Sequence, residues 1–380
     1  MSLSILHSQS LGPSIFNDCG PNNDCNIDMN DGYNTGPVVE PVATDESEGT
    51  ARPESSNYVL VAGGAGYIGA HTCKALARAG YIPVTLDNLS TGHRAAVRWG
   101  PLVEADIRDK AVVAETVRRY GITSCIHFAA ASLVAESMRN PAKYYDNNVV
   151  AGLALIEALV EQDVKHIVFS STAATYGTPC VDLISETEPT VPINPYGATK
   201  LAFEGVLQWM AGATGFTYTI LRYFNAAGAD PEGDIGESHV PETHLIPLVC
   251  KAALHEGAPL TVFGTDYATQ DGSAIRDYIH VNDLANAHIA ALERLMTGAD
   301  SQIYNLGTGH GVTVLEVIRA TERLLGKAVP HILGPRRSGD PVSMVADVSK
   351  ANRDLGWRAT QSELDSLVET AMVWERNRRY

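Results

Sequence analysis

The segment Tyr196-Gly197-Ala198-Thr199-Lys200 places a phenol and an ammonium group four positions apart. On a helix this spacing brings both groups to one face. A cation beside a tyrosine stabilises the phenolate and lowers a pKa that is ordinarily about 10. Tyr196 could then accept a proton from an alcohol as hydride leaves the carbon. Thr172, which closes the run Phe169-Ser170-Ser171-Thr172, offers a hydroxyl for the same reaction.

A second pattern could hold a dinucleotide. Gly63, Gly66 and Gly69 lie between an apolar run and a helical stretch, and Asp87 follows about 20 residues later. Glycines there let the backbone approach a pyrophosphate at the positive end of a helix. The Asp87 carboxylate can accept hydrogen bonds from a ribose hydroxyl but would repel a 2′-phosphate, which favours NAD over NADP. Alone, the glycines would fit a tight turn and Asp87 a solvated strand end, and the Tyr-x-x-x-Lys spacing is common by chance. Together the three signals predict a nicotinamide-dependent enzyme.

The residues named above must be positioned by the surrounding secondary structure, in which short β-branched runs alternate with longer helical patterns. This alternation predicts βαβ units, because strands buried on both faces appear in the sequence as continuous apolar runs. The fold class expected is therefore α/β, a doubly wound parallel sheet of the Rossmann type with a smaller C-terminal α/β substrate domain. We expect the nucleotide-binding domain at residues 57–225 and the substrate domain at residues 226–380, with segments around 270–305 returning to the first domain. The five predicted strands are Tyr58–Ala62, Ile82–Leu86, Ser124–Phe128, His166–Ser170 and Tyr218–Arg222.

Two helical stretches carry apolar faces, and two further short helices are predicted near Leu245–Leu254 and Leu315–Leu325. The faces either pack on the sheet or pair in part with a second subunit, and the sequence leaves both readings open. Their residues are Val149, Leu153, Ile156 and Val160, and separately Phe203, Val206, Leu207 and Met210.

Composition excludes several classes of function. The 380-residue chain has a formal charge of −16, which argues against an extended nucleic-acid or anionic-membrane surface. No stretch approaches the roughly 18 apolar residues that would span a bilayer. Six cysteines without CxxC spacing fit a reduced, cytoplasmic compartment. Residues 1–56 carry nine acids and one base, so we expect a disordered acidic tail and no secretory signal. No metal site is expected.

From residue 58 to residue 374 the chain resembles the UDP-glucose (UDP-galactose) 4-epimerase family of extended short-chain dehydrogenases. Many motifs occur in order, so the resemblance is specific, whereas the segment before Ser56 has no counterpart in that family. The matching stretches are Gly63–Gly69, Asp87–Leu89, Asp106–Arg108, His127–Ala130, Tyr144–Val149, Leu221–Asn225, Arg276–Val281 and Tyr304–Gly307.

The resemblance implies tightly held NAD, a UDP-sugar substrate and a homodimer. Tyr196 would deprotonate the sugar 4-hydroxyl, Lys200 would bind the nicotinamide ribose and Thr172 would replace a more usual serine. The resemblance assigns the cofactor to Gly63, Gly66, Tyr67, Ile68, Gly69, Asp87, Asn88, Asp106, Ile107, Phe128, Ala129, Ala130, Asn147, Tyr196, Lys200 and Tyr223. It assigns the substrate to Thr172, Tyr196, Asn225, His244, Leu245, Phe263, Arg276, Arg337, Asp340 and Met344.

Two positions depart from relatives or bear on the substrate. Ser132 stands where some relatives carry a lysine near the cofactor, so one charge on the pyrophosphate is missing. Met344 falls where the size of the residue is associated with admitting or excluding an N-acetyl group, and methionine is flexible and intermediate in size. Acceptance of UDP-N-acetylglucosamine is therefore an open hypothesis.

Three alternatives remain. A 4-epimerase of another UDP-sugar, such as a UDP-pentose (xylose/arabinose) or a UDP-uronic acid, would differ only in the lining of its pocket. A sugar-nucleotide 4,6-dehydratase needs acidic groups after the threonine, where this chain has Ala173 and Ala174. A non-catalytic NAD-binding regulator would not require Thr172, Tyr196 and Lys200 together.

Overall fold

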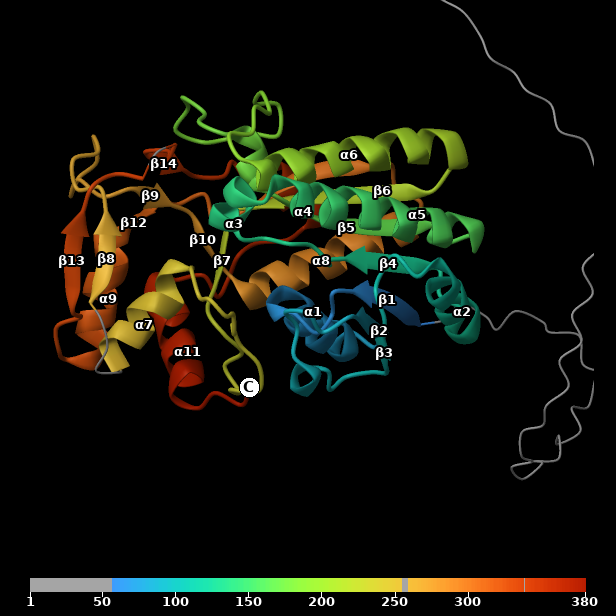
Figure 1. Ribbon diagram of the computed structural model, residues 1–380, viewed down its shortest axis with the longest axis horizontal. Helices are drawn as coiled ribbons and strands as arrows, with labels where there is room; N and C mark the ends of the chain where they lie inside the picture. Colours follow the sequence, from blue (N-terminus) through green and yellow to red (C-terminus); the bar gives the residue numbers. More distant parts are fainter. Residues whose placement is uncertain (1–56, 255–258, 338) are drawn as a thin grey trace, which may run out of the picture. The chain divides into compact units, whose positions relative to one another are not determined.

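The computed structural model describes residues 57–254, 259–337 and 339–380. At its centre lies a seven-stranded sheet in the order β3-β2-β1-β4-β5-β6-β11 (Figure 1). All neighbouring strands in it are parallel, which confirms the predicted doubly wound class. The strands are β1 Tyr58–Ala62, β2 Ile82–Asp87, β3 Leu102–Glu104, β4 Ser124–His127, β5 His166–Thr172, β6 Thr217–Tyr223 and β11 Gln302–Leu306.

Five of these strands match the apolar runs predicted from the sequence, while β3 and β11 were missed. β3 has only three residues, none of them fully buried, so it carries no strong apolar signal. β11 comes after a long excursion of the chain and pairs with β6. Both therefore join the sheet through tertiary pairing that local pattern does not reveal.

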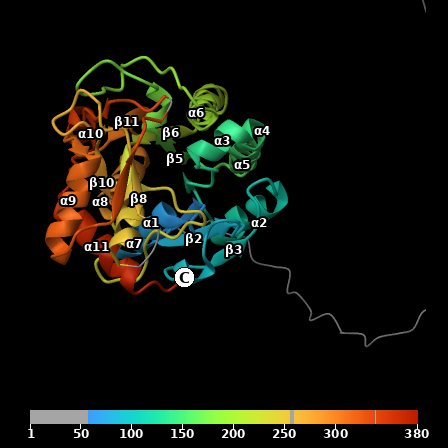
Figure 2. The same ribbon diagram turned by 60° about the vertical axis from the view of Figure 1, so that its left-hand side comes forward.

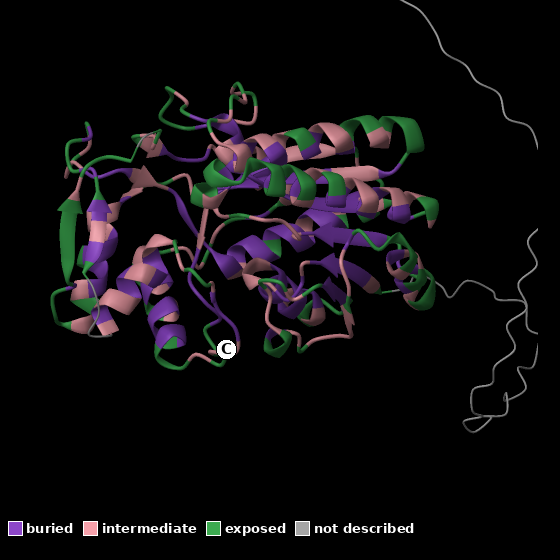
Figure 3. Ribbon diagram, viewed as in Figure 1, coloured by how far each residue is buried: buried purple, intermediate pink, exposed green. Residues whose placement is uncertain are grey.

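Helices cover both faces of this sheet (Figures 1 and 2). Alternating side chains explain why, because Leu60 packs into one buried core and Val61 into the other. The first core includes residues of α2 Lys110–Tyr120, α5 Ala151–Glu161 and α6 Pro195–Thr214. The second includes residues of α1 Tyr67–Arg78, α8 Val281–Met296 and α10 Ser349–Leu355. Figure 3 shows the buried strands between partly exposed helices.

The two predicted apolar helix faces lie on α5 and α6. Ile156, Phe203 and Leu207 are fully buried in the first core, which confirms packing on the sheet for them. Gly152 explains how closely the two helices approach, since a Cβ there would lie 2.5 Å from the Phe203 ring.

A third core lies in the part of the chain that follows the sheet's sixth strand. The helices near Leu245 and Leu315 form as predicted, and α8 and β11 return to the large sheet. The boundary at residues 225 and 226 remains a prediction. The elements of this part are β7 Asn225–Ala227, α7 Leu245–Leu254, β8 Leu260–Phe263, β9 Ile275–Arg276, β10 Tyr278–His280, β12 Val312–Thr313, α9 Val314–Leu325, β13 His331–Gly334, β14 Ser343–Met344 and α11 Leu364–Arg376.

Short helical segments complete the described chain. They connect the strands on the side where the predicted site residues lie: η1 Arg94–Ala96, α3 Val134–Arg139, α4 Pro141–Tyr145, the π-helical η2 Asp146–Val150 and η3 Ala173–Tyr176. The expected acidic tail at residues 1–56 lies outside the described residues. No helix in the described ranges has both the length and the apolar character needed to cross a membrane.

Candidate functional site

The glycine turn joins β1 to α1 at the point where the sheet order reverses between β1 and β4. Gly63 has a φ of +82°, and a Cβ there would lie 2.6 Å from the backbone nitrogen of Ala129. A Cβ on Gly69 would lie 2.2 Å from the carbonyl oxygen of Gly63, so this residue lets the helix pack against the turn. Gly66, the N-cap of α1, meets nothing closer than 3.5 Å and leaves its side of the turn open. These three glycines thus form a cradle at an unblocked helix N-terminus, which suits a pyrophosphate.

Asp87 ends β2 and holds the neighbouring backbone with both carboxylate oxygens. It accepts hydrogen bonds from the amides of Ala65 at 3.0 Å and Leu89 at 2.9 Å. Burial raises its pKa, although these two amides oppose the shift. Leu89 has a φ of +56°, a conformation that an L side chain rarely adopts and that often marks functional loops. The geometry therefore sets Asp87 directly beside the glycine turn.

Two further predicted cofactor residues meet beyond Asp87. The Asn88 amide donates to the Asp106 carboxylate at 3.0 Å, which links the loops after β2 and β3. Ile107 is 7% exposed and packs into the first core. An adenine ring at this end of the sheet would find polar groups from both loops.

The segment after β4 lies against the glycine turn. The amides of Phe128 and Ala129 donate to the carbonyl of Ala62 at 2.7 and 3.0 Å, and Ala130 follows in the same segment. Tyr67, the first residue of α1, donates its hydroxyl to the carbonyl of Gly228 at 2.6 Å. The next residue, Ile68, packs against the second core. This part of the chain therefore connects the cradle to segments far away in the sequence.

Asn147 and Asn148 lie in the π-helical segment η2. Asn147, predicted from the sequence, donates to Asn148 at 3.2 Å. Asn148 was not singled out, yet it is 3% exposed and donates to Ala131 and Thr199, each at 3.0 Å. Two adjacent asparagines before an apolar helical run were the available signal, and π-helical turns frequently mark functional sites.

Tyr196 and Thr172 come together from different elements. Asn194 caps α6 by accepting from the Gly197 amide at 2.8 Å, and Pro195 supplies a preset first helical turn. Tyr196 is thereby fixed in the first turn of α6. Its hydroxyl lies near that of Thr172, which ends β5 and is 8% exposed, and Thr172 acts on its pKa. The two hydroxyls thus converge at the carboxyl edge of the sheet.

The expected lowering of the Tyr196 pKa is not what the structure shows. Burial raises that pKa, and the hydrogen bond with Thr172 opposes the shift without reversing it. Lys200 turns elsewhere, because its ammonium donates to the carbonyl of Ser170 at 2.7 Å and lies 4.8 Å from the Phe169 ring centroid. Tyr196 and Lys200 lie on one helix, as predicted, but the contact with Ser170 directs the ammonium to β5 and away from the phenol.

Lys200 is itself an unusual cation. It is 3% exposed, and burial lowers its pKa from 10.5 to about 7 although Glu204 opposes the shift. The Glu204 carboxylate is engaged with the guanidinium of Arg222, at 2.9 Å from its Nε. A buried amine of this kind can hold a ribose hydroxyl.

Ser170 was missed by the sequence analysis and connects two predicted residues. Its carbonyl accepts a hydrogen bond from the Lys200 ammonium, and its hydroxyl is hydrogen-bonded to the hydroxyl of Tyr223 at the end of β6. Tyr223 is 9% exposed. The apolar runs gave no sign of this role, because it depends on the pairing of β5 with β6.

Four predicted substrate residues meet on the β8 and β9 side. Asp340 pairs with the guanidinium of Arg276 and lies 3.5 Å from Nε of Arg337. The Arg337 guanidinium also lies 4.7 Å from the ring centroid of Phe263. Arg276 has a side chain 15% exposed and Arg337 one that is 64% exposed. The arrangement offers two forks and an aromatic face, groups that suit a nucleoside diphosphate.

Asn225 and Met344 flank this group. The Asn225 amide donates to the carbonyl of Asp277 at 2.9 Å, beside Arg276 in sequence. Met344 pairs with Arg276 across β14 and β9 and packs with Ala173, next to Thr172. Met344 is 7% exposed and therefore links the two groups of predicted residues through buried contacts.

His244 and Leu245 stand at the start of α7. Nδ1 of His244 lies 2.7 Å from Glu237 and 3.0 Å from Glu242. The imidazole of this predicted substrate residue is therefore already paired with two carboxylates of the protein. Burial alone would lower its pKa, but these carboxylates raise it to about 10. Leu245 is partly buried and packs against the third core.

The chain is similar to known proteins over most of its length. Residues 59–307 match the model of the NAD dependent epimerase/dehydratase family. The UDP-glucose 4-epimerase of Halalkalibacterium halodurans is 49% identical over 84% of this chain and 95% of its own. The crystal structure of UDP-glucose 4-epimerase from Brucella ovis in complex with NAD has a TM-score of 0.82 at 49% identity, covering 83% of this chain and 97% of that one. For the enzyme from Bifidobacterium longum in complex with NAD+ and UDP, the TM-score is 0.79 at 38% identity, with coverage of 84% and 98%.

Proposed function

Because the chain belongs to the NAD dependent epimerase/dehydratase family, we propose that it interconverts UDP-galactose and UDP-glucose with NAD as cofactor. Curated relatives named UDP-glucose 4-epimerase support this activity. One observation carries it for this chain: the hydroxyls of Tyr196 and Thr172 lie together at the carboxyl edge of the sheet, close enough for Thr172 to oppose the rise of the Tyr196 pKa. Two hydroxyls placed there can face one sugar hydroxyl.

The glycine cradle and Asp87 are proposed to hold NAD. Gly66 leaves room for the pyrophosphate at the start of α1, and the buried Asp87 carboxylate suits a ribose diol. Lys200 is proposed to bind the second ribose from the opposite side of the turn. When bound, NAD supplies a hydride acceptor and a positively charged ring that favours the phenolate of Tyr196.

The chemical work of the protein then falls to Tyr196 and Thr172. Tyr196 would take the proton of the sugar 4-hydroxyl and later return it, while Thr172 would hold the same oxygen. Rotation of the 4-keto sugar about its phosphate link would present its other face, so that the configuration at C4 inverts without net oxidation. Elimination to a 4,6-dehydratase product lacks an acid after Thr172, because Ala173 and Ala174 follow it.

Arg276, Arg337, Asp340 and Phe263 are proposed to hold the uridine diphosphate. Their mutual contacts bring cationic forks and an aromatic face to one place. Asn225 and Met344 would border the sugar, and His244 and Leu245 would contribute from the start of α7.

We also propose a homodimer in a reduced, cytoplasmic compartment. Large apolar side chains remain exposed on α3, η2 and α6: Met138, Val150 and Trp209, the last at 84%. Burying them against a second copy would remove this apolar area from water. Sedimentation mass tests the assembly, and a single-chain mass at micromolar concentration contradicts it.

The four cysteines in the described ranges, Cys73, Cys125, Cys180 and Cys250, are unpaired, which fits a reducing environment.

The first test is incubation of purified protein with UDP-galactose and no added NAD, followed by proton NMR of the anomeric signals. Growth of the UDP-glucose signals toward a mixed equilibrium supports both the activity and retained cofactor. Activity only after NAD is added would mean that the cofactor dissociates. No UDP-glucose signal either without or with added NAD rejects the hexose assignment and favours a UDP-pentose or UDP-uronic acid as substrate.

Turnover of N-acetylated sugars is a second, narrower possibility, which the flexible Met344 favours. The same NMR experiment with UDP-N-acetylglucosamine tests it. Absence of turnover under conditions where UDP-glucose reacts would refute it.

A further inference from the structure

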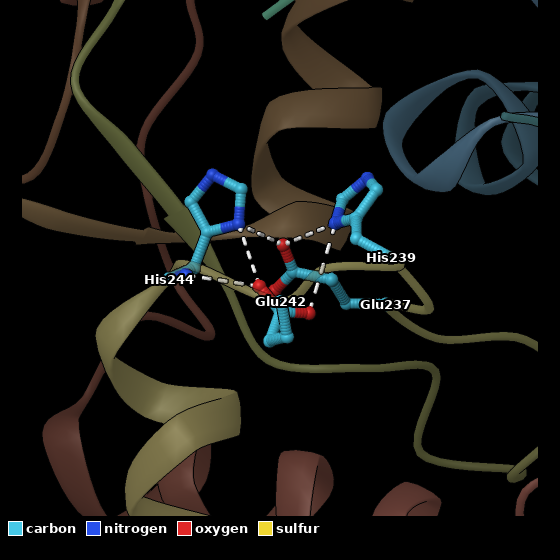
Figure 4. A group of neighbouring side chains, drawn as sticks. All are labelled: Glu237, His239, Glu242 and His244. Atoms are coloured by element: carbon cyan, nitrogen blue, oxygen red, sulfur yellow. Dashed lines mark hydrogen bonds and ion pairs between the residues drawn. The ribbon is translucent and has the colours of Figure 1, made fainter. Parts of the chain in front are cut away.

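Four side chains converge near the start of α1 and α7, and one of them, His244, is also a proposed substrate residue. Glu237, His239, Glu242 and His244 each offer one ligand atom, and these four atoms all lie within 4.8 Å of one another. Figure 4 shows the two imidazoles on either side of the two carboxylates, with all four groups turned inward. Two imidazoles and two carboxylates are a donor set that suits zinc.

The spacings fit a tetrahedral ion. Zinc bonds to nitrogen and oxygen of about 2.0–2.2 Å place neighbouring ligand atoms about 3.4 Å apart. Oε1 of Glu237 lies 3.2 Å from Nδ1 of His239 and 2.7 Å from Nδ1 of His244. The two oxygens of Glu242 each face one imidazole: Oε1 lies 3.0 Å from Nδ1 of His244 and Oε2 lies 3.7 Å from Nδ1 of His239. An ion could enter with small side-chain shifts.

Unmatched polar atoms point the same way. Oε2 of Glu242 and Nδ1 of His239 are buried and make no hydrogen bond, and their charged contacts lie within the cluster, at 3.7 Å from one another and 3.2 Å from His239 to Glu237. Burying a carboxylate oxygen without a hydrogen bond is costly. Both atoms face the centre of the cluster, where a cation would satisfy them together.

Hydrogen bonds from other parts of the chain hold the backbone that carries these ligands. Trp374 of α11 donates to the carbonyl of Glu237 at 2.9 Å, and His93 approaches the carbonyl of Ser238 at 3.0 Å. The side chain of His239 is 25% exposed and that of His244 41%, which leaves a path for an ion from solvent. A preformed and accessible ligand set needs little reorganisation to bind.

A second cluster, of three carboxylates, differs from this one because it already contains a cation of the protein. Asp230, Glu232 and Asp234 also gather closely, but the ammonium of Lys74 lies 2.7, 2.8 and 3.0 Å from their carboxylates. A cation of the protein already fills that position. In the Glu237–His244 cluster the basic groups are imidazoles, which can themselves coordinate a metal.

We propose that Glu237, His239, Glu242 and His244 form a structural site for one Zn²⁺ ion. The site lies next to the cofactor turn, since the ring centroids of His239 and Tyr67 are 6.5 Å apart and Tyr67 is the first residue of α1. A bound ion would tie the segment before α7 to the start of α1. This proposal does not depend on which sugar nucleotide the protein uses.

The test is a calorimetric titration of the full, untagged chain with Zn²⁺ after treatment with a chelator. We expect saturable binding of one ion and a higher thermal unfolding midpoint with zinc, because an ion that binds only the folded state stabilises it. Glu242→Gln and His239→Gln are each expected to weaken binding at least tenfold. The control His331→Gln removes an exposed histidine elsewhere and should leave binding unchanged.

A measurement on the unmutated protein guards against variants that fail to fold. Co²⁺ added to the chelator-treated chain should produce the visible absorption of a four-coordinate site, and Zn²⁺ should abolish it. Absence of both saturable zinc binding and the cobalt spectrum overturns the proposal. Zinc binding that survives both ligand substitutions overturns it as well, because the ion would then lie elsewhere.

Discussion

The cofactor turn and the arginine group, defined as Phe263, Arg276, Arg337 and Asp340, are built in different ways. In the turn, Gly63, Gly69 and Asp87 are set by close backbone contacts among the segments that follow β1, β2 and β4. In the arginine group, side chains from separate short segments meet through ion pairs and a cation over a ring. The first is rigid because backbone atoms leave no alternative, while the second depends on long side chains that can rearrange.

The comparison predicts that residues at the junction of the two regions matter most. Tyr196→Phe removes only the hydroxyl that would move the proton, so kcat for UDP-galactose should fall by roughly 10²–10⁴. Retained NAD and the unfolding midpoint should stay close to wild type. Tyr81→Phe, which changes a partly buried tyrosine whose hydroxyl lies 3.5 Å from Glu293, is the control and should be fully active. A Tyr196→Phe protein as active as wild type would instead favour a non-catalytic NAD-binding protein.

A substitution in the turn should have the next largest effect. Asp87→Asn replaces a carboxylate that accepts from two amides with a group that can accept with only one atom. Affinity for NAD should drop by about tenfold to a hundredfold, as expected for lost hydrogen bonds to a charged group. Fluorescence titration of cofactor-stripped protein measures it, with exposed Asp182→Asn as the control. Equal NAD affinity in Asp87→Asn would contradict the proposed ribose contact.

Within the arginine group, burial should rank the two guanidinium groups. Arg276→Gln should raise KM for UDP-galactose by about tenfold or more, because its charge is largely shielded from water. Arg337→Gln should raise it by about fivefold or less, since this side chain is mostly exposed. Steady-state kinetics of both variants measures the two KM values and shows which guanidinium contributes more to binding. A larger effect at Arg337 would mean that the group closes around the substrate.

The last prediction concerns the stability of the cofactor-free chain and its dependence on pH. The folded pKa of Lys200 is about 7 against 10.5 for an ordinary lysine, so between these values the unfolded chain binds a proton that the folded chain lacks. The cost of burying Lys200 is full below about pH 7 and fades as the pH rises toward about 10. Cofactor-free wild type should therefore gain free energy of unfolding relative to Lys200→Met over this range. Urea unfolding at both ends of the range measures it, and a difference that stays constant rejects the lowered pKa.

Local sequence predicted much of the fold and the central part of the candidate site. Continuous apolar runs marked five strands, because strands buried on both faces admit little else. Glycine spacing, the acid at the end of β2 and the Tyr-Lys spacing each act over a few residues, so the chain itself displays them. The resemblance to the 4-epimerase family added the residues that are far apart in sequence, and the family model and the relatives confirm that resemblance.

By itself the sequence determined which residues can carry chemistry, since a phenol, an ammonium and a glycine turn owe their properties to covalent structure and local geometry. Only the tertiary structure decided where the side chains point. It turned Lys200 toward Ser170 instead of Tyr196, joined β11 to β6 and closed Glu237, His239, Glu242 and His244 into one cluster. Such contacts depend on packing between distant segments, and burial and neighbouring charges then set the pKa values that no local pattern contains.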